Sequence, residues 1–80
     1  MSIQIYRSKI DKIDNDILNL LESRKIYSKL ISKIKAKNNQ SLTDLEREEE
    51  ILNRLKSQKN KLKQEQIENI FKMIINECKV

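Results

Sequence analysis

The sequence of 80 residues contains no glycine, proline, histidine or tryptophan, and it has a single cysteine, Cys78. Without glycine and proline, the chain lacks the usual residues of tight turns and β-hairpins. Without histidine, and with one thiol, the composition argues against a metal site and against a catalytic Ser-His-Asp set. One cysteine also excludes an internal disulfide. These absences favour a helical protein that uses neither a metal nor a cofactor.

The sequence also lacks long apolar runs and is poor in aromatic residues. No run approaches the roughly 20 apolar residues that cross a membrane, and residues 1–7 show no leader pattern with an extended apolar segment and a cleavage site. The aromatic residues are Tyr6, Tyr27 and Phe71, which are few for stacking on nucleic-acid bases. We therefore expect a cytoplasmic protein whose partners include neither a membrane nor nucleic acid.

Basic residues outnumber acidic ones, with 17 Lys and Arg against 12 Asp and Glu, and the formal net charge is +5. Such a charge suits nucleic acid, an anionic membrane or a small acidic ligand, and does not by itself distinguish among them. For most of the lysines, a well-solvated helical surface is a sufficient explanation. The informative charges are those that interrupt an apolar pattern.

Apolar residues recur at intervals of three and four, which predicts helices throughout the chain. A first, long helix of heptad type runs from about Ile3 to beyond Ile34, and only Arg24 interrupts its main apolar stripe. Further apolar residues widen this stripe, so more than one neighbouring helix must cover it. The polar segment 37–41 ends the helix.

Two shorter helices follow the long one. The second is expected from about Asp44 to about Ser57, and Thr43 with Glu46 has the spacing of a capping box at its start. The third follows the polar link 58–61. The residues expected to face inward are, on the second helix, Leu45, Ile51, Leu52 and Leu55 and, on the third, Ile67, Ile70, Phe71, Ile74, Ile75 and Cys78.

The length of the first helix indicates the architecture. About 35 residues at about 1.5 Å each make a helix of roughly 50 Å, whereas a compact chain of this size has a radius of gyration of roughly 12 Å. The helix therefore overshoots its own globule, and a small single domain of residues 1–80 is only marginally stable alone. We predict an all-α fold of three helices per chain in an intertwined, antiparallel six-helix homodimer.

Arg24 is the clearest charge at a core position. A buried guanidinium either pairs with a carboxylate inside the bundle or faces a pocket that receives an anion, and the sequence leaves both interpretations open. Lys35 follows eleven residues later, so both side chains project from the same side of the helix about 16 Å apart. The two can converge on one small ligand, although Lys35 by itself is more simply explained as a solvated lysine near a helix end, where it suits the dipole.

Arg7 precedes Arg24 by seventeen residues, or roughly 25 Å along the helix, and is rotated from it by about a quarter turn. The two arginines of one chain cannot share a small ligand. In an antiparallel dimer, however, Arg7 of the partner chain can approach Arg24. The alternative is a surface arginine in the first turns of the helix.

Charged residues also mark the second helix. Glu48 occupies an inward slot of the apolar spacing, while Asp44 and Arg47 lie near the helix start. Asp44 suits the helix dipole, and Arg47 can form a surface pair with a neighbouring glutamate. Cys78 is expected to be a small core residue, because no histidine is present to activate its thiol. A cationic pocket with an acid suits the folding and electrostatic stabilisation of an anionic substrate, without covalent chemistry.

Several motifs together resemble the all-helical (AroQ-type) chorismate mutases over nearly the whole chain. Residues 7–14 are similar to the family's opening Arg-x-x-Ile-x-x-(Leu/Ile)-Asp, and Arg24 and Lys33-x-Lys35 follow at the expected spacing. Residues 44–48 resemble the family's Asp-x-x-Arg-Glu, and residues 67–75 resemble its Ile-x-x-(Ile/Leu)-Phe-x-x-Ile-Ile. Each motif alone is weak, but all of them in order are specific.

The resemblance implies a Claisen rearrangement of chorismate to prephenate, on the route to phenylalanine and tyrosine. It also implies the roles of individual residues. Arg24 and Arg7 of the partner chain would hold the two substrate carboxylates. Lys35 would contact the ether oxygen whose bond breaks, and Glu48 with Asp44 would hold the ring hydroxyl. The partners implied are chorismate, a second copy of the chain and, in addition, another enzyme of the aromatic pathway.

The resemblance further places Arg47 in the cationic wall and Cys78 where the family has a serine near the ring carboxylate. The family usually carries a glutamine or glutamate about four residues beyond Cys78 as a second contact to the ether oxygen, and the printed sequence ends at Val80. Two alternatives are open: another group, such as Gln4 or Glu77, makes this contact, or the domain depends on a partner enzyme.

Two other functions are consistent with the same residues. An isochorismate-pyruvate lyase shares the fold and the cationic pocket, but that family lacks the acidic pair formed here by Asp44 and Glu48, which favours the mutase. The other alternative is a non-catalytic helical module for dimerisation or nucleic-acid binding. In such a module, Arg24 and Glu48 would only fix the register of the helices.

Overall fold

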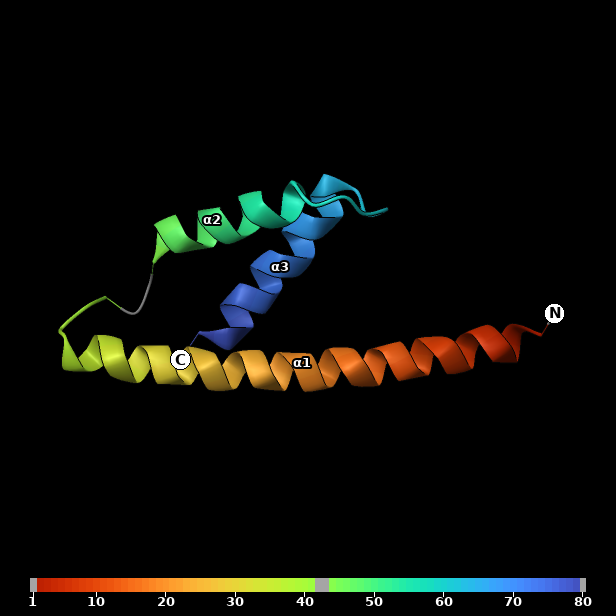
Figure 1. The fold of residues 1–80 in the computed structure, drawn as a ribbon, viewed down its shortest axis with the longest axis horizontal. Helices are drawn as coiled ribbons and strands as arrows, with labels where there is room; N and C mark the ends of the chain where they lie inside the picture. Colours follow the sequence, from red (N-terminus) through yellow and green to blue (C-terminus); the bar gives the residue numbers. More distant parts are fainter. Residues whose placement is uncertain (1, 42–43, 80) are drawn as a thin grey trace.

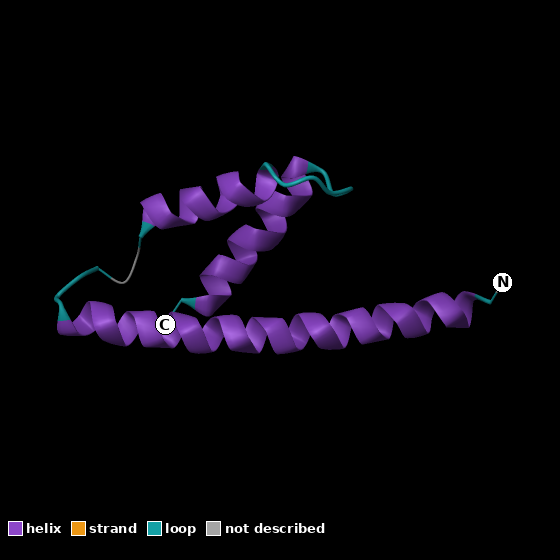
Figure 2. Cartoon of the chain, viewed as in Figure 1, coloured by secondary structure: helices purple, strands orange, loops and turns teal. Residues whose placement is uncertain are grey.

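The computed structural model describes residues 2–41 and 44–79, which form three helices and, within these ranges, no strand (Figure 2). They are α1 (Ile3–Lys37), α2 (Leu45–Lys56) and α3 (Gln64–Cys78). The predicted all-α class, with one long helix and two shorter ones, is confirmed. No helix of the described chain is long and apolar enough to cross a membrane.

Both ends of α1 are capped, and neither cap requires a glycine. Ser2 is the N-cap, and its hydroxyl accepts a hydrogen bond of 3.1 Å from the Gln4 N–H. At the other end Asn39 adopts a positive φ of 56°, a conformation that asparagine tolerates better than most residues. The Gln40 N–H donates to the Lys35 carbonyl at 2.8 Å, which is the bond of a Schellman motif.

The start of α2 differs from the predicted one by a single residue. The N-cap is Asp44, whose carboxylate accepts a hydrogen bond of 3.0 Å from the Arg47 N–H. Thr43, the predicted first member of a capping box with Glu46, lies outside the described residues. Asp44 serves as well because its carboxylate both accepts the hydrogen bond and complements the positive end of the helix dipole.

Helices α2 and α3 form a hairpin, and the C-terminal part of α3 returns to the middle of α1 (Figure 1). The buried residues of the described chain are Ile67, Ile75 and Cys78, all on α3. Phe71 and Ile74 are half-buried, whereas Ile70 on the same expected face is exposed. The core within one chain is therefore small and follows one side of α3.

Leu45 was expected to face inward, and within this chain the prediction is wrong, because its side chain is 74% exposed. The reason is where α3 ends. Its last helical residue is Cys78, and the next residue, Lys79, contacts Glu48, which lies nearly one turn after Leu45. Leu45 at the start of α2 thus lies beyond the end of α3, and its side chain stays exposed within the described chain.

The N-terminal half of α1 extends away from the other two helices (Figure 1). The described chain measures 57 × 24 × 16 Å and has a radius of gyration of 16.0 Å, well above the roughly 12 Å of a compact chain of this length. None of the described residues of α1 is buried. The predicted overshoot of the first helix beyond its own globule is confirmed.

Candidate active site

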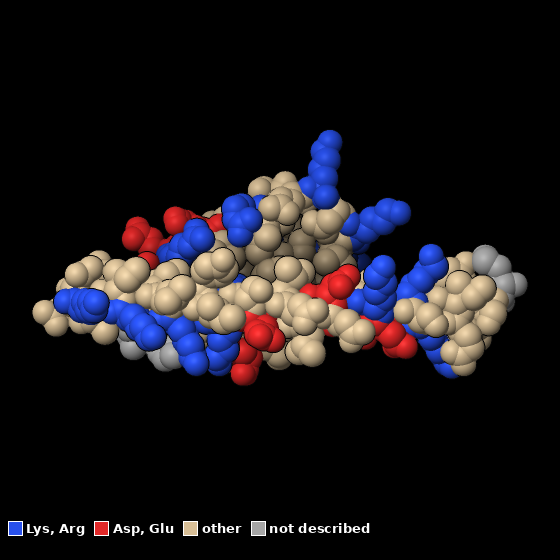
Figure 3. Space-filling model, turned by 60° about the horizontal axis from the view of Figure 1, so that its bottom comes forward, with Lys and Arg blue, Asp and Glu red and all other residues tan. Residues whose placement is uncertain are grey.

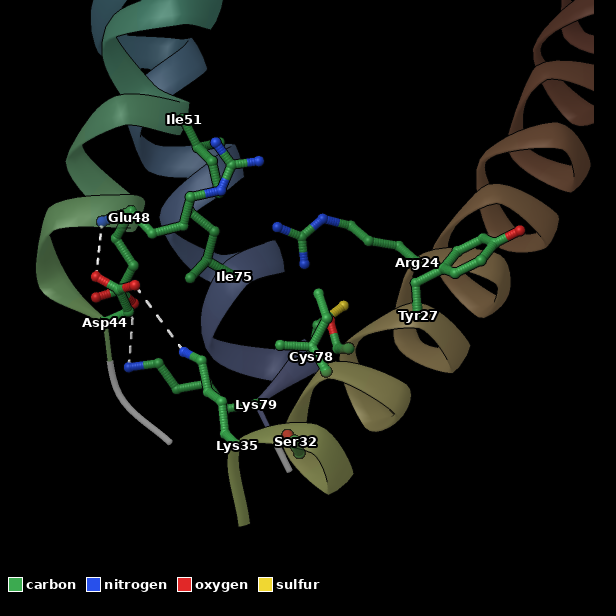
Figure 4. A pocket seen from close by; sticks show the side chains of 13 residues that line it. Arg24, Tyr27, Ser32, Lys35, Asp44, Glu48, Ile51, Ile75, Cys78 and Lys79 are labelled. Carbon is green, nitrogen blue, oxygen red and sulfur yellow. Dashed lines mark hydrogen bonds and ion pairs between the residues drawn. The ribbon is translucent and has the colours of Figure 1, made fainter. Parts of the chain in front are cut away.

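A pocket lies where three helix ends meet: the C-terminal half of α1, the first turns of α2 and the C-terminal end of α3 (Figure 4). Its volume is about 290 Å³, which suits a small molecule. Polar and charged side chains share the walls with a few apolar ones. The lining residues are Arg24, Tyr27, Ser28, Ile31, Ser32, Lys35, Asp44, Arg47, Glu48, Ile51, Ile75, Cys78 and Lys79.

Arg24 extends from α1 into this pocket towards α2 (Figure 4). The residue is half-buried, and no ion pair or hydrogen bond joins its side chain to another residue of the described ranges. Of the two interpretations that the sequence left open, the structure shows the pocket-facing arginine within one chain. A half-buried guanidinium without a carboxylate partner is a ready site for a ligand anion.

Lys35 and Asp44 face one another across the space between α1 and α2. The Lys35 Nζ lies 3.9 Å from the Asp44 Oδ2, and the two side chains are 22% and 47% exposed. At this separation and exposure the pair is a weak one. Lys35 is therefore held near the pocket and can turn to a ligand at little cost, while the other Asp44 oxygen stays engaged in capping α2.

Glu48 is the second acid of the pocket, and its side chain is 22% exposed. Its Oε1 lies 3.1 Å from the Nζ of Lys79, which follows the end of α3. The inward position that the spacing predicted for Glu48 agrees with its half-buried state. Lys79, by contrast, was not among the predicted site residues.

Arg47 and Cys78 contribute to the pocket in different ways. Arg47 lines it, but its guanidinium also pairs with Glu50 at 3.8 Å, and both side chains are mostly exposed. This is the surface pair that the sequence offered as an alternative role. Cys78 is 4% exposed and forms part of the pocket wall as a buried, free thiol. The described residues include no group of three potential metal ligands.

Arg7 does not lie at this pocket. It is in the second turn of α1, seventeen residues and roughly 25 Å before Arg24. The structure thus brings together six of the seven predicted site residues and leaves one at the far end of the helix. Within one chain, the two arginines cannot contact the same small ligand.

Two serines were also missed by the sequence reasoning, although a signal for them exists. Ser28 and Ser32 follow Arg24 at steps of four and line the same pocket. Residues at such steps share one face of a helix, and Lys35 continues that face one turn later. No comparable signal exists for Lys79, because it lies outside any helix and its backbone is extended.

The electrostatics of the pocket favour an anion. Four cationic side chains (Arg24, Lys35, Arg47 and Lys79) and two carboxylates (Asp44 and Glu48) line it, so its formal net charge is +2. Exposed basic side chains also line the C-terminal half of α1 in a row (Figure 3), where lysines occur at every fourth position from residue 25 to residue 37. A field of this sign attracts a small dianion towards the pocket.

The fold and the pocket define a small helical protein with a cationic pocket among its three helices. A family model of chorismate mutase type II matches residues 6–80, so the chain belongs to this family. The family expected from the sequence motifs is confirmed, and with it the expected class of enzyme, a chorismate mutase. No solved structure matched the chain significantly.

Three curated relatives from Buchnera aphidicola are each named bifunctional chorismate mutase/prephenate dehydratase. The protein of the subspecies from Acyrthosiphon pisum is 40% identical over 78 residues, which are 95% of this chain and 20% of that protein. The proteins of the subspecies from Schizaphis graminum and Baizongia pistaciae are 40% and 35% identical over 74 residues, or 90% of this chain and 19% and 20% of theirs. This chain spans about a fifth of the length of these relatives.

Proposed function

We propose that two copies of this chain together bind chorismate and rearrange it to prephenate. In this Claisen rearrangement one carbon–oxygen bond of the substrate breaks while one carbon–carbon bond forms within the same molecule. The protein donates no atom and forms no covalent bond. It must select a compact substrate conformer and stabilise the negative charge that develops on the ether oxygen. The observation that carries the proposal is the pocket of net charge +2 with Arg24 unpaired among the described residues.

The cationic residues are proposed to hold the ends of the substrate that carry charge. Arg24 binds one carboxylate, and Arg7 of the partner chain binds the other. Lys35 donates a hydrogen bond to the ether oxygen, where its charge is most useful in the transition state. The weak contact of Lys35 with Asp44, at 3.9 Å, supports this role because it leaves the ammonium group free to turn.

The acids are proposed to hold the ring hydroxyl of the substrate. Glu48 is the principal acceptor, and Asp44, the N-cap of α2, lies four residues before it and lines the same pocket. Arg47 completes the cationic wall, and Cys78 packs near the ring carboxylate. Carboxylates facing a dianion must be offset by nearby cations, and the ion pairs of both acids with lysines support this arrangement.

The homodimer is proposed because the N-terminal half of α1 has an apolar stripe that stays exposed within the described chain. Ile10, Ile13 and Ile17 are 54%, 54% and 47% exposed. A second copy placed antiparallel covers this stripe and brings its own Arg7 towards Arg24 of the first chain. Isologous pairing of this kind is the commonest way in which small chains associate.

The names of the relatives suggest the enzyme that uses the product. Each is a bifunctional chorismate mutase/prephenate dehydratase, and this chain matches about a fifth of its length. We infer that prephenate made by this chain passes to a prephenate dehydratase. Such an enzyme is the aromatic-pathway partner that the sequence led us to expect.

The proposed activity is tested by incubating the purified protein with chorismate, following the loss of its ultraviolet absorbance, and identifying the product. Prephenate is the expected product. A parallel incubation with isochorismate detects a lyase, because that reaction releases pyruvate. Pyruvate release from isochorismate without formation of prephenate would instead assign the lyase. No turnover of either compound, together with salt-sensitive binding to DNA, would contradict an enzyme.

The contribution of Arg7 from the partner chain is tested by mixing two inactive variants. Arg7→Ala and Arg24→Ala are each expected to lack activity, but a heterodimer of the two has one intact site. Random mixing gives heterodimers in half of the dimers, each with one of two sites intact, so about a quarter of wild-type activity should return. If both arginines acted within one chain, mixing would restore nothing.

A further inference from the structure

Lys79 contacts Glu48 in the pocket, although it comes after the last helical residue of α3. The backbone leaves the helix at Lys79 in an extended conformation (φ −63°, ψ 143°), and the side chain reaches α2, where its Nζ lies 3.1 Å from the Glu48 Oε1 (Figure 4). The two residues before this lysine are held against the rest of the chain. Cys78 before it is buried, and the Lys25 ammonium donates a hydrogen bond of 3.2 Å to the Glu77 carbonyl.

We propose that Lys79 is a positioning residue that holds Glu48 for the substrate hydroxyl, an inference that rests on the proposed function. Lys79 pairs with one oxygen of the carboxylate, Oε1. Within the described ranges no other side chain forms an ion pair or hydrogen bond with the Glu48 carboxylate. The second oxygen, Oε2, is therefore available to accept a hydrogen bond from a ligand.

The two acids of the pocket differ in how they are held, and this difference makes Lys79 important. Asp44 is fixed by the helix that it caps, through the Arg47 N–H, as well as by Lys35. Glu48 has Lys79 alone among the described residues. Without Lys79 the Glu48 side chain is free to change rotamer, and the formal charge of the pocket falls from +2 to +1. Both changes weaken the binding of a dianion.

The test is the steady-state kinetics of Lys79→Met, measured with chorismate on the full chain. Glu48 holds the ring hydroxyl in the ground state and in the transition state alike, so KM should rise roughly three- to tenfold while kcat stays within about twofold of wild type. Lys79→Arg keeps the charge and should restore KM. The matched control is Lys72→Met, which removes an ion-paired lysine of α3 that does not line the pocket.

A second variant separates positioning from direct contact with the substrate. In a Glu48→Gln background the carboxylate partner is gone and only the loss of one positive charge from the pocket remains, so adding Lys79→Met should raise KM by clearly less than it does with Glu48 present. An equal further loss in this background would overturn the inference, because Lys79 would then act on the substrate itself. An unchanged KM for Lys79→Met in an active wild-type background would overturn the inference and leave the proposed function intact. A wild-type protein without turnover would overturn both.

Discussion

The two halves of α1 carry the same apolar spacing and lie in different surroundings. In the C-terminal half, Arg24, Ser28, Ser32 and Lys35 are half-buried and face a pocket. In the N-terminal half every described residue from 2 to 20 is exposed, although apolar residues recur there at the same intervals. One half forms a pocket with the other helices of its own chain, and the side chains of the other half stay exposed within the described chain.

The comparison teaches that the apolar spacing of a helix predicts which face is buried. It does not predict which other helix, of the same chain or of a second copy, covers that face. Full burial of an isoleucine side chain stabilises a fold by roughly 1.5–3 kcal/mol. The exposed stripe of Ile10, Ile13 and Ile17 therefore holds a large part of the stabilisation that this chain has available. The part of the chain that forms the pocket needs this stabilisation too, since the described chain buries few residues.

The largest expected effect comes from replacing Arg24, in the half of α1 that lines the pocket. Arg24→Ala should lower kcat/KM by about a hundred- to a thousandfold, because it removes the charge that meets a substrate carboxylate. The fold should survive, since the Arg24 side chain forms no ion pair with the described residues. Chorismate consumption gives the rate, and circular dichroism gives the helix content.

Arg54→Ala is the matched control for Arg24→Ala. Arg54 is an exposed arginine of α2 that does not line the pocket, so its loss should leave the rate unchanged. If Arg24→Ala kept nearly full activity, the assignment of the pocket to the reaction would be wrong.

The next effect comes from the uncovered half of α1. Ile13→Lys should weaken dimerisation by at least about a hundredfold, because association would bury an unpaired ammonium group from each chain. Loss of the dimer should also remove activity, since Arg7 of the partner chain leaves the site. Sedimentation equilibrium measures the association, and the same samples are assayed with chorismate.

Asn15→Lys is the control for this variant. It introduces the same charge two residues later, about 200° around the helix and away from the apolar stripe. It should therefore remain dimeric and active. A wild-type chain that sediments as a monomer at assay concentrations would contradict the role given to this half of the helix.

Much of the fold follows from the sequence because its signals are local. The spacing of three and four predicts α1 to its last turn, and the absence of glycine and proline leaves no competing strand pattern. The exposure of Leu45 could not be predicted in the same way, because it depends on where α3 ends in space relative to α2. The exposure of Leu45 is set by how α2 packs against α3, and neither sequence segment alone carries that information.

The residues of the candidate site also fall into two groups, those that local spacing predicts and those that depend on how the helices pack. Arg24 and Glu48 occupy positions that the helical spacing assigns to apolar residues, and Lys35 lies on the same helix face as Arg24. All three could therefore be predicted as site residues from the sequence. Ser28 and Ser32 follow the same face and were within reach of the same reasoning. Lys79 was not, because its contact with Glu48 forms only when the C-terminal end of α3 is placed beside α2.

The smallest expected effect lies in the two ion pairs of Glu68 on α3, one with Lys56 of α2 and one with Lys72 of α3 itself. Glu68 lies 3.3 Å from the Lys56 ammonium and 3.5 Å from that of Lys72. The hydrogen bond and charge of Lys56, and then the charge of Lys72, lower the pKa of the Glu68 carboxyl. Because the folded pKa lies below that of an unfolded glutamate, about 4.3, the stabilisation is complete above that pH and is lost as the pH falls through the folded value.

Glu68→Gln should therefore lower Tm slightly at neutral pH, and the difference from wild type should close as the pH falls below about 4.3. It should also shrink in high salt, since both lysine contacts are partly exposed and are screened by ions. Glu49→Gln, which removes an exposed acid of α2 that has no ion pair among the described residues, is the control. Thermal unfolding followed by circular dichroism measures both. A Tm difference that persisted unchanged in acid would show that Glu68 acts through packing, and that the hairpin of α2 and α3 does not depend on this charge.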